Sequence, residues 1–218
     1  MNTLSISSLV FSYQSGSGLQ IPRLEVEGGS PLFLTGPSGC GKTTLLKLCC
    51  GLLQPAEGEV RFGDVRISGL EAADSADFRK KTSGVIFQAL ELVPHLTLRE
   101  NVSLPLLLRG ESPGTEPLEA IEQLGLADKL EKRPGELSQG EQQRGAICRA
   151  LQARPALLLA DEPTSSLDPA MSRSVMTILD EYCRGSGACG LITTHDVDAI
   201  PAAARTETFS TITEGAPA

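Results

Sequence analysis

Nine consecutive residues have the types and spacing that bind a triphosphate: Gly36, Pro37, Ser38, Gly39, Cys40, Gly41, Lys42, Thr43 and Thr44. They match the pattern G-x-x-x-x-G-K-[ST], in which glycines let backbone N–H groups approach phosphate oxygens. A helix that begins after the loop would add positive potential at the same place. Lys42 is expected to neutralise the β- and γ-phosphates, and the Thr43 hydroxyl suits Mg²⁺, which prefers oxygen ligands. The segment predicts nucleotide binding, with an ordinary glycine turn as the alternative.

Two adjacent carboxylates, Asp161 and Glu162, follow the apolar run 157–160. A short apolar run of this kind is typical of a buried parallel strand, and open α/β sheets hold their ligands at the carboxyl ends of the strands. Asp161 therefore suits the coordination shell of Mg²⁺, and Glu162 suits the activation of an attacking water. Gln88 and His195 also follow apolar runs, so they are expected at the same edge of the sheet.

A further pattern, S-x-x-E, is formed by Ser138 and Glu141 in front of a helical stretch. Taken alone, it predicts a capping box, in which the hydroxyl and the carboxylate satisfy free N–H groups at a helix start. A helix start that carries a serine and a glycine can also bind phosphate. Both roles are compatible in one segment.

In this order, and over nearly the whole chain, these segments resemble the motifs of the ATP-binding-cassette (ABC) ATPase family. The resemblance identifies the Walker A loop at 36–44, the Q-loop glutamine at Gln88, the signature motif at 137–141, the Walker B strand at 157–162, the D-loop at 166–168 and the switch histidine at His195. Tyr13 is similar to the aromatic residue that stacks on adenine, and a buried strand aromatic is the alternative. The segments 91–106 and 133–137 are similar to the lipoprotein-release and macrolide-export branch.

The resemblance also implies the roles of individual residues. Catalytic roles fall to Glu162, His195 and Gln88, and Mg²⁺ would be held by Thr43, Gln88 and Asp161. Contacts to ATP are expected from Tyr13, from all nine loop residues, and from Ser138, Gln139, Gly140, Glu141 and Asp168. In the family, two cassettes pair head to tail, so that each ATP lies between the glycine loop of one chain and the signature helix of the other.

The implied function is that of the ATP-hydrolysing subunit of a transporter, which drives a separate membrane permease. One alternative is an ATPase module that regulates a membrane protein without moving a solute. A DNA-repair or chromosome-organising ATPase is disfavoured because the chain has no sustained heptads for a coiled coil. The signature departs from the usual L-S-G-G-Q at Gln139 and Glu141, which puts the rate of hydrolysis in question while Ser138 and Gly140 are kept.

The composition fits this interpretation. The 218 residues include 27 acidic and 19 basic side chains, giving a formal charge of −8. Nucleic acid is not expected to be a partner, because phosphate-backbone binding needs clustered Lys and Arg. No apolar stretch approaches the ~18 residues of a spanning helix, and the N-terminus has no signal pattern, so a cytoplasmic chain held at the inner membrane face by its permease is expected. The six cysteines are expected to be reduced core thiols.

These residues need a particular scaffold. We expect a single ABC ATPase domain of the α/β class: a P-loop NTPase core with a mainly parallel sheet and flanking helices, an antiparallel β layer, and an inserted α-helical lobe. Residues 1–88 and 155–218 would form the core and the β layer, and 89–154 the lobe that carries the signature. The antiparallel layer is expected from 4–34. Within 94–108 most leucines are expected in the lobe core, and the rest could line a groove for a permease helix.

Overall fold

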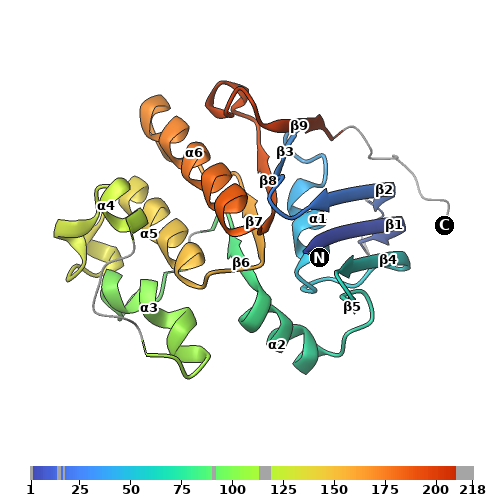
Figure 1. The fold of residues 1–218 in the computed structure, drawn as a ribbon, viewed down its shortest axis with the longest axis horizontal. Helices are drawn as coiled ribbons and strands as arrows, with labels where there is room; N and C mark the ends of the chain where they lie inside the picture. The colour runs from blue at the N-terminus through green and yellow to red at the C-terminus, as the bar shows by residue number, and fades with distance from the viewer. Residues whose placement is uncertain (1, 14–15, 17, 90–91, 113–118, 210–218) are drawn as a thin grey trace.

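Two sheets of different type lie beside each other in the computed structural model, which describes residues 2–13, 16, 18–89, 92–112 and 119–209 (Figure 1). The strands are β1 (Thr3–Ser12), β2 (Gly18–Glu27), β3 (Leu32–Thr35), β4 (Glu57–Phe62), β5 (Val65–Arg66), β6 (Ser83–Ile86), β7 (Leu157–Asp161), β8 (Cys189–Thr194) and β9 (Arg205–Thr208). The α-helices are α1 (Lys42–Cys49), α2 (Ala72–Thr82), α3 (Leu98–Leu108), α4 (Glu119–Gln123), α5 (Gln139–Gln152) and α6 (Pro169–Ser186). Short 3₁₀ helices span Ala127–Lys129, Pro134–Glu136 and Val197–Ala199.

The larger sheet has the order β6-β7-β8-β3-β9, and all of its strand pairs are parallel. Its three central strands are buried at every residue, as expected where both faces of a parallel sheet are covered. Alternate side chains of β7 enter two different cores: Leu157 and Leu159 face one, and Leu158 and Ala160 face the other. This double burial fixes the strands whose carboxyl ends carry the predicted site residues.

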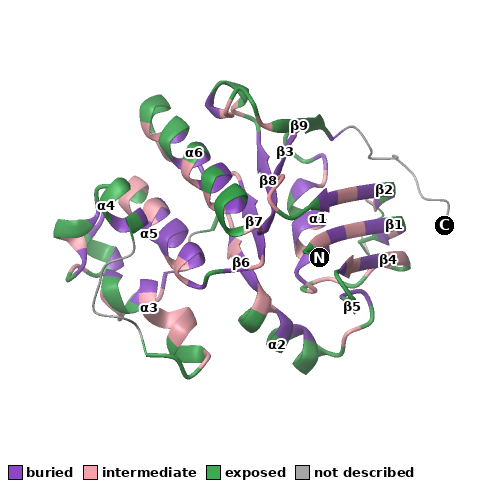
Figure 2. Ribbon diagram, viewed as in Figure 1, coloured by how far each residue is buried: buried purple, intermediate pink, exposed green. Residues whose placement is uncertain are grey.

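One core lies between the two sheets and encloses α1 (Figures 1 and 2). The antiparallel sheet, ordered β2-β1-β4-β5, contributes inward-facing residues such as Leu4 and Ile6. From α1 come Leu45, Leu46 and Leu48, each at most 1% exposed. Burial of a leucine side chain contributes roughly 1.5–3 kcal/mol, so this core holds α1, and with it the start of the nucleotide loop, firmly in place.

The second core lies on the other face of the parallel sheet, where α3, α4, α5 and α6 gather. Buried residues of the helical segment, such as Val102, Ile121 and Ile147, pack in the same cluster as Val175 of α6 and Ile192 of β8. The three helices α3 to α5 all fall within 89–154. They share one core with the parallel sheet and α6.

The predicted antiparallel layer needs correction in two places. Residues 4–34 do supply most of β1 and all of β2, but β3 (Leu32–Thr35), which overlaps the end of that range, belongs to the parallel sheet. Conversely β4 and β5 lie outside the range 4–34 and yet belong to the antiparallel sheet, because β4 pairs with β1 and β5 pairs with β4. In β4 only Val60 and Phe62 are buried, so its sequence carries a weak strand pattern.

Two expectations from composition can be compared with the structure. Within the described ranges, no helix is both long and apolar enough to cross a bilayer. All six cysteines are buried free thiols, which confirms the prediction of reduced core cysteines.

Candidate active site

The loop between β3 and α1 follows a buried strand and leads into a helix that no side chain caps. Gly39 and Gly41 have φ of 78° and 102°, in the left-handed region where glycine is favoured. The first N–H groups of an α-helix have no partner inside the helix. At α1 these groups are available to an anion, and the helix dipole favours a negative charge there.

A cavity of about 360 Å³ opens at this loop. The residues that line it are Ser38, Gly39, Cys40, Gly41, Lys42, Thr43, Thr44, Gln88, Glu162 and His195. The structure therefore brings together most of the predicted loop residues with the three predicted catalytic ones. They come from the carboxyl ends of β3, β6, β7 and β8, which is where open α/β sheets bind their ligands.

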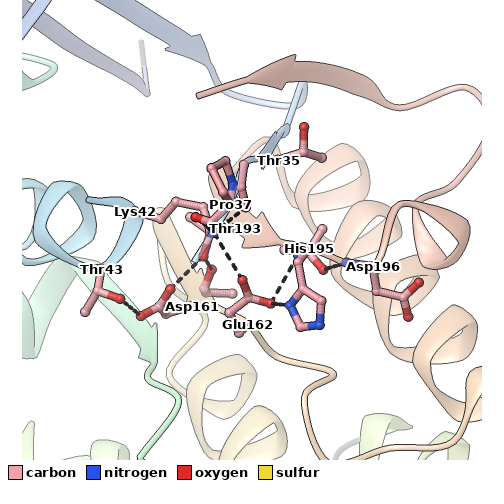
Figure 3. Close-up of polar contacts among 12 residues, drawn as sticks. Thr35, Pro37, Lys42, Thr43, Asp161, Glu162, Thr193, His195 and Asp196 are labelled. Atoms are coloured by element: carbon pink, nitrogen blue, oxygen red, sulfur yellow. Dashed lines mark hydrogen bonds and ion pairs between the residues drawn. The ribbon is translucent and has the colours of Figure 1, made fainter. Parts of the chain in front are cut away.

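Lys42 is held over the loop by three oxygen atoms (Figure 3). Its Nζ atom donates to the carbonyl oxygens of Gly36 (2.7 Å) and Pro37 (3.1 Å), and it lies 3.4 Å from Oε1 of Glu162. Since Lys42 is only 6% exposed, its charge needs such partners in place of water. Phosphate oxygens could replace them with stronger, charge-assisted hydrogen bonds.

Asp161 is 2% exposed and both of its oxygens are engaged. Oδ2 accepts a hydrogen bond from the Thr43 hydroxyl at 2.5 Å, and Oδ1 accepts one from the Thr193 hydroxyl at 2.7 Å (Figure 3). A hydroxyl and a carboxylate side by side are a donor set that fits Mg²⁺. The described residues contain no group of three or more His, Cys, Asp or Glu placed to hold a metal.

Glu162 lies directly beyond β7 with φ of 50°, a conformation that non-glycine residues rarely adopt. Its N–H group donates to the Thr193 carbonyl at 3.0 Å. Its Oε2 atom lies 2.6 Å from Nδ1 of His195 and accepts a hydrogen bond from the His195 main-chain N–H at 3.2 Å (Figure 3). Unusual backbone conformations of this kind concentrate at functional sites.

Tyr13 lies beside the loop, where an adenine ring could stack on it. Its hydroxyl is 3.0 Å from the Thr44 hydroxyl, and its ring packs edge to face on Phe11. At 41% exposure, Tyr13 is not the buried strand aromatic that was the alternative.

The signature segment lies apart from this cavity, since none of residues 137–141 lines it. Ser138 caps α5, and Glu141 completes the predicted capping box. Gly140 approaches the loop after β7 closely: a Cβ atom there would lie 3.2 Å from the Ser166 carbonyl oxygen. Asp168, predicted to contact nucleotide, caps α6 by accepting hydrogen bonds from the N–H groups of Ala170 and Met171.

A family model described as ABC transporter matches residues 19–165, which contain the glycine loop, the signature segment and both carboxylates. The chain belongs to the ABC transporter family. It matches the ATPase domain of that family in sequence, and it has the predicted α/β P-loop fold.

Named relatives support this assignment. An ABC transporter ATP-binding protein of Mycobacterium tuberculosis is 42% identical over 212 residues, covering 94% of this chain but 64% of that protein. This cassette thus spans about 64% of the length of that relative. The lipoprotein-releasing system ATP-binding protein LolD of Myxococcus xanthus is 40% identical, covering 90% of this chain and 91% of LolD. LolD confirms the similarity to the lipoprotein-release part of the predicted lipoprotein-release and macrolide-export branch.

Solved ABC cassettes share the fold. The dimeric structure of the bacterial ABC transporter cassette MJ0796 has a TM-score of 0.79 and 31% identity, covering 90% of this chain and 89% of that one. A structure of the same cassette in a post-hydrolysis state, bound to ADP and phosphate, has a TM-score of 0.82 and 30% identity with the same coverage.

Sequence reasoning missed two residues of the site. Thr193 was not singled out from the sequence, yet its hydroxyl orients Asp161. The contact follows from the register of β7 with β8, which places Asp161 opposite Thr193. Lys129 was not considered, and its Nζ atom lies 3.8 Å from Oε1 of Glu141. Nothing in the sequence spacing of Lys129 and Glu141 indicates the contact between them.

Proposed function

We propose that this cassette hydrolyses ATP at sites shared between two copies of the chain and so drives a separate membrane permease. The observation that carries the proposal is that the motifs of one chain lie in two separate places. The loop, Asp161, Glu162, His195 and Gln88 meet at one cavity or border it, while the signature helix start lies outside it. A second chain is needed to bring a signature to each cavity.

The chemistry follows from the contacts around Glu162. A water between Glu162 and the γ-phosphate attacks phosphorus, its proton passes to the carboxylate, and the bond from phosphorus to the bridging oxygen of ADP breaks. His195, through Nδ1, orients Glu162, and Lys42 stabilises the charge on the phosphates. Glu162 and His195 act at positions that the buried strands β7 and β8 hold fixed.

Mg²⁺ would be held by Thr43, by Asp161 and by the amide oxygen of Gln88, which lines the same cavity. When bound, it neutralises charge on the β- and γ-phosphates. Thr193 keeps Asp161 in its orientation through the hydrogen bond to Oδ1. ATP is further contacted by Tyr13 on the adenine side and by the loop N–H groups on the phosphate side.

The second chain supplies the signature. Ser138, Gln139, Gly140 and Glu141 form or flank the start of α5, a 14-residue helix whose dipole favours an anion at that end. The dimeric structure of MJ0796 supports a pairing of this kind. Asp168, which caps α6 next to the loop contacted by Gly140, would lie close to the same interface.

The permease partner is assigned to a groove between the helical segment and the core. This groove has a volume of about 410 Å³ and is lined by Arg79, Lys80, Ser83, Gly84, Val85, Leu104, Pro105, Leu108, Arg149, Ala150 and Ala153. Leu107 and Leu108 are 52% and 58% exposed, whereas Leu98 and Val102 of the same helix are buried. An amphipathic helix of the permease, with apolar and acidic side chains, fits this surface and would keep the cassette at the inner membrane face.

The test uses the Glu162→Gln variant, which is expected to bind ATP without turnover. Addition of ATP and Mg²⁺ should raise the mass measured by light scattering from one chain to two. A second change, Ser138→Arg, should abolish the dimer by a clash at the shared phosphate and leave nucleotide binding to the single chain intact. An unchanged mass with ATP in the Glu162→Gln protein argues against shared sites.

A further inference from the structure

The hydroxyl of Ser138 is already bound within its own chain. Its Oγ atom donates a hydrogen bond to Oε2 of Glu141 at 2.8 Å, and the Ser138 main-chain N–H donates to the same oxygen at 2.8 Å. In return the Glu141 N–H donates to Ser138 Oγ at 3.3 Å. A capping box needs only the contacts to the two main-chain N–H groups. The additional bond commits the hydroxyl proton of Ser138 to a carboxylate.

The charge of Glu141 is sustained by its surroundings. Hydrogen bonds from the N–H group and hydroxyl of Ser138, together with Lys129 and Arg144 nearby, hold the pKa of Glu141 below its usual range. The carboxylate is therefore ionised at neutral pH. Lys129 neutralises it only in part, since its Nζ atom lies 3.8 Å from Glu141 but 3.0 Å from Asp128.

We propose that Glu141 is a positioning residue that keeps the Ser138 hydroxyl from the γ-phosphate, and so sets the ATP concentration at which two cassettes join. The inference rests on the proposed head-to-tail dimer, in which Ser138 donates to a phosphate of the facing chain. Glu141 opposes that contact in two ways. Its oxygen competes with phosphate for the same proton, and its negative charge repels the phosphate.

The substitution Glu141→Gln removes the negative charge of the side chain and keeps its shape. The amide oxygen that it introduces can still accept from the Ser138 N–H and preserve the cap, but it is a neutral and weaker acceptor for the hydroxyl. In the Glu162→Gln background, we expect Glu141→Gln to lower the ATP concentration for half-maximal dimer formation about tenfold. The opposite charge change, Lys129→Gln, should raise that concentration, because it leaves Glu141 less neutralised.

Two further measurements distinguish this role from a purely structural one. Raising NaCl from about 0.05 M to about 0.5 M should reduce the effect of Glu141→Gln on the ATP concentration for half-maximal dimer formation, because salt screens charge. In a Ser138→Ala background, the effect of Glu141→Gln should shrink at least severalfold, since the hydroxyl through which it acts is gone. ATP affinity of the single chain, measured below the dimerisation range, should be the same in all variants.

The outcomes separate the two proposals. If Glu162→Gln does not dimerise with ATP at all, the shared-site function fails. If it dimerises but Glu141→Gln leaves unchanged or raises the ATP concentration for half-maximal dimer formation, the proposed role of Glu141 is wrong. The proposed hydrolysis at shared sites is then unaffected. An equal effect of Glu141→Gln with and without the Ser138 hydroxyl, insensitive to salt, would also overturn the inference, since it would mean that the residue only maintains the helix start.

Discussion

His195 holds one oxygen of Glu162 from two sides. Its ring Nδ1 lies 2.6 Å from Oε2 of Glu162, and its main-chain N–H donates to the same atom at 3.2 Å. The other oxygen, Oε1, lies 3.4 Å from Nζ of Lys42. The carboxylate is therefore fixed between the residue that follows β8 and the lysine that begins α1, and its two oxygens have different partners.

The first prediction concerns the base. Glu162→Gln keeps the shape of the side chain but loses the basicity that accepts a proton from water. Turnover of ATP by the purified cassette should fall about 10²-fold or more, equivalent to about 3 kcal/mol of barrier. Phosphate release measures the rate, and nucleotide binding followed in parallel should persist. Turnover near the wild-type rate would exclude Glu162 as the base.

A second prediction uses the two histidines of the chain as a matched pair. His195→Ala removes the ring that positions Glu162, and turnover should fall by about 10- to 100-fold with little loss of ATP binding. His95 is exposed in the loop before α3, so His95→Ala should leave turnover unchanged. Equal effects of the two substitutions on steady-state hydrolysis would contradict the role of His195.

The third prediction concerns the permease groove. Leu108→Glu places a negative charge on the groove, where it replaces an apolar contact and repels the acidic side chains of the permease helix. It should reduce stimulation of hydrolysis by the permease about tenfold while the isolated chain keeps its basal rate. Val65 in β5 is 41% exposed and lies outside the groove, so Val65→Glu is the control. Unchanged stimulation in the Leu108→Glu complex would place docking on another surface.

The fourth prediction concerns thiol reactivity. Burial disfavours the charged thiolate and raises the pKa of Cys148, Cys183 and Cys189 to about 12. Only about one such thiol in 10⁴ is ionised at pH 8, so these cysteines should not react with a disulfide reagent in the folded cassette. Absorbance should report six thiols after unfolding in guanidinium. Cys40, which lines the nucleotide cavity, should react first, and ATP should slow it. Rapid reaction of three or more thiols in the native protein would contradict the burial.

Sequence reasoning worked best where chemistry follows directly from chain order. Glu162 and His195 each come after an apolar strand, and parallel strands end at one edge of a sheet, so their proximity could be predicted. The bond from Thr193 to Asp161 could not, because it depends on the register of β7 with β8. Likewise, no local pattern shows that the buried ammonium of Lys42 lies beside Glu162.

The strands of the fold also differ in how well they could be predicted from the sequence. The buried strands β7 and β8 could be recognised because each contains a run of apolar residues before its polar end. By contrast β4 alternates poorly and β5 has only two residues, so their membership of the antiparallel sheet depends on the pairing of β4 with β1 and of β5 with β4. The expected antiparallel layer was incomplete for this reason.

The separation of the signature from the cavity within one chain has a genetic consequence. In the proposed dimer, a chain with a defective Glu162 still carries an intact signature, and a chain with a defective Ser138 still carries an intact cavity. When two such inactive chains pair, one site receives both defects and the other receives neither. Two inactive alleles of this gene, expressed together, would then complement each other and restore one working site per pair.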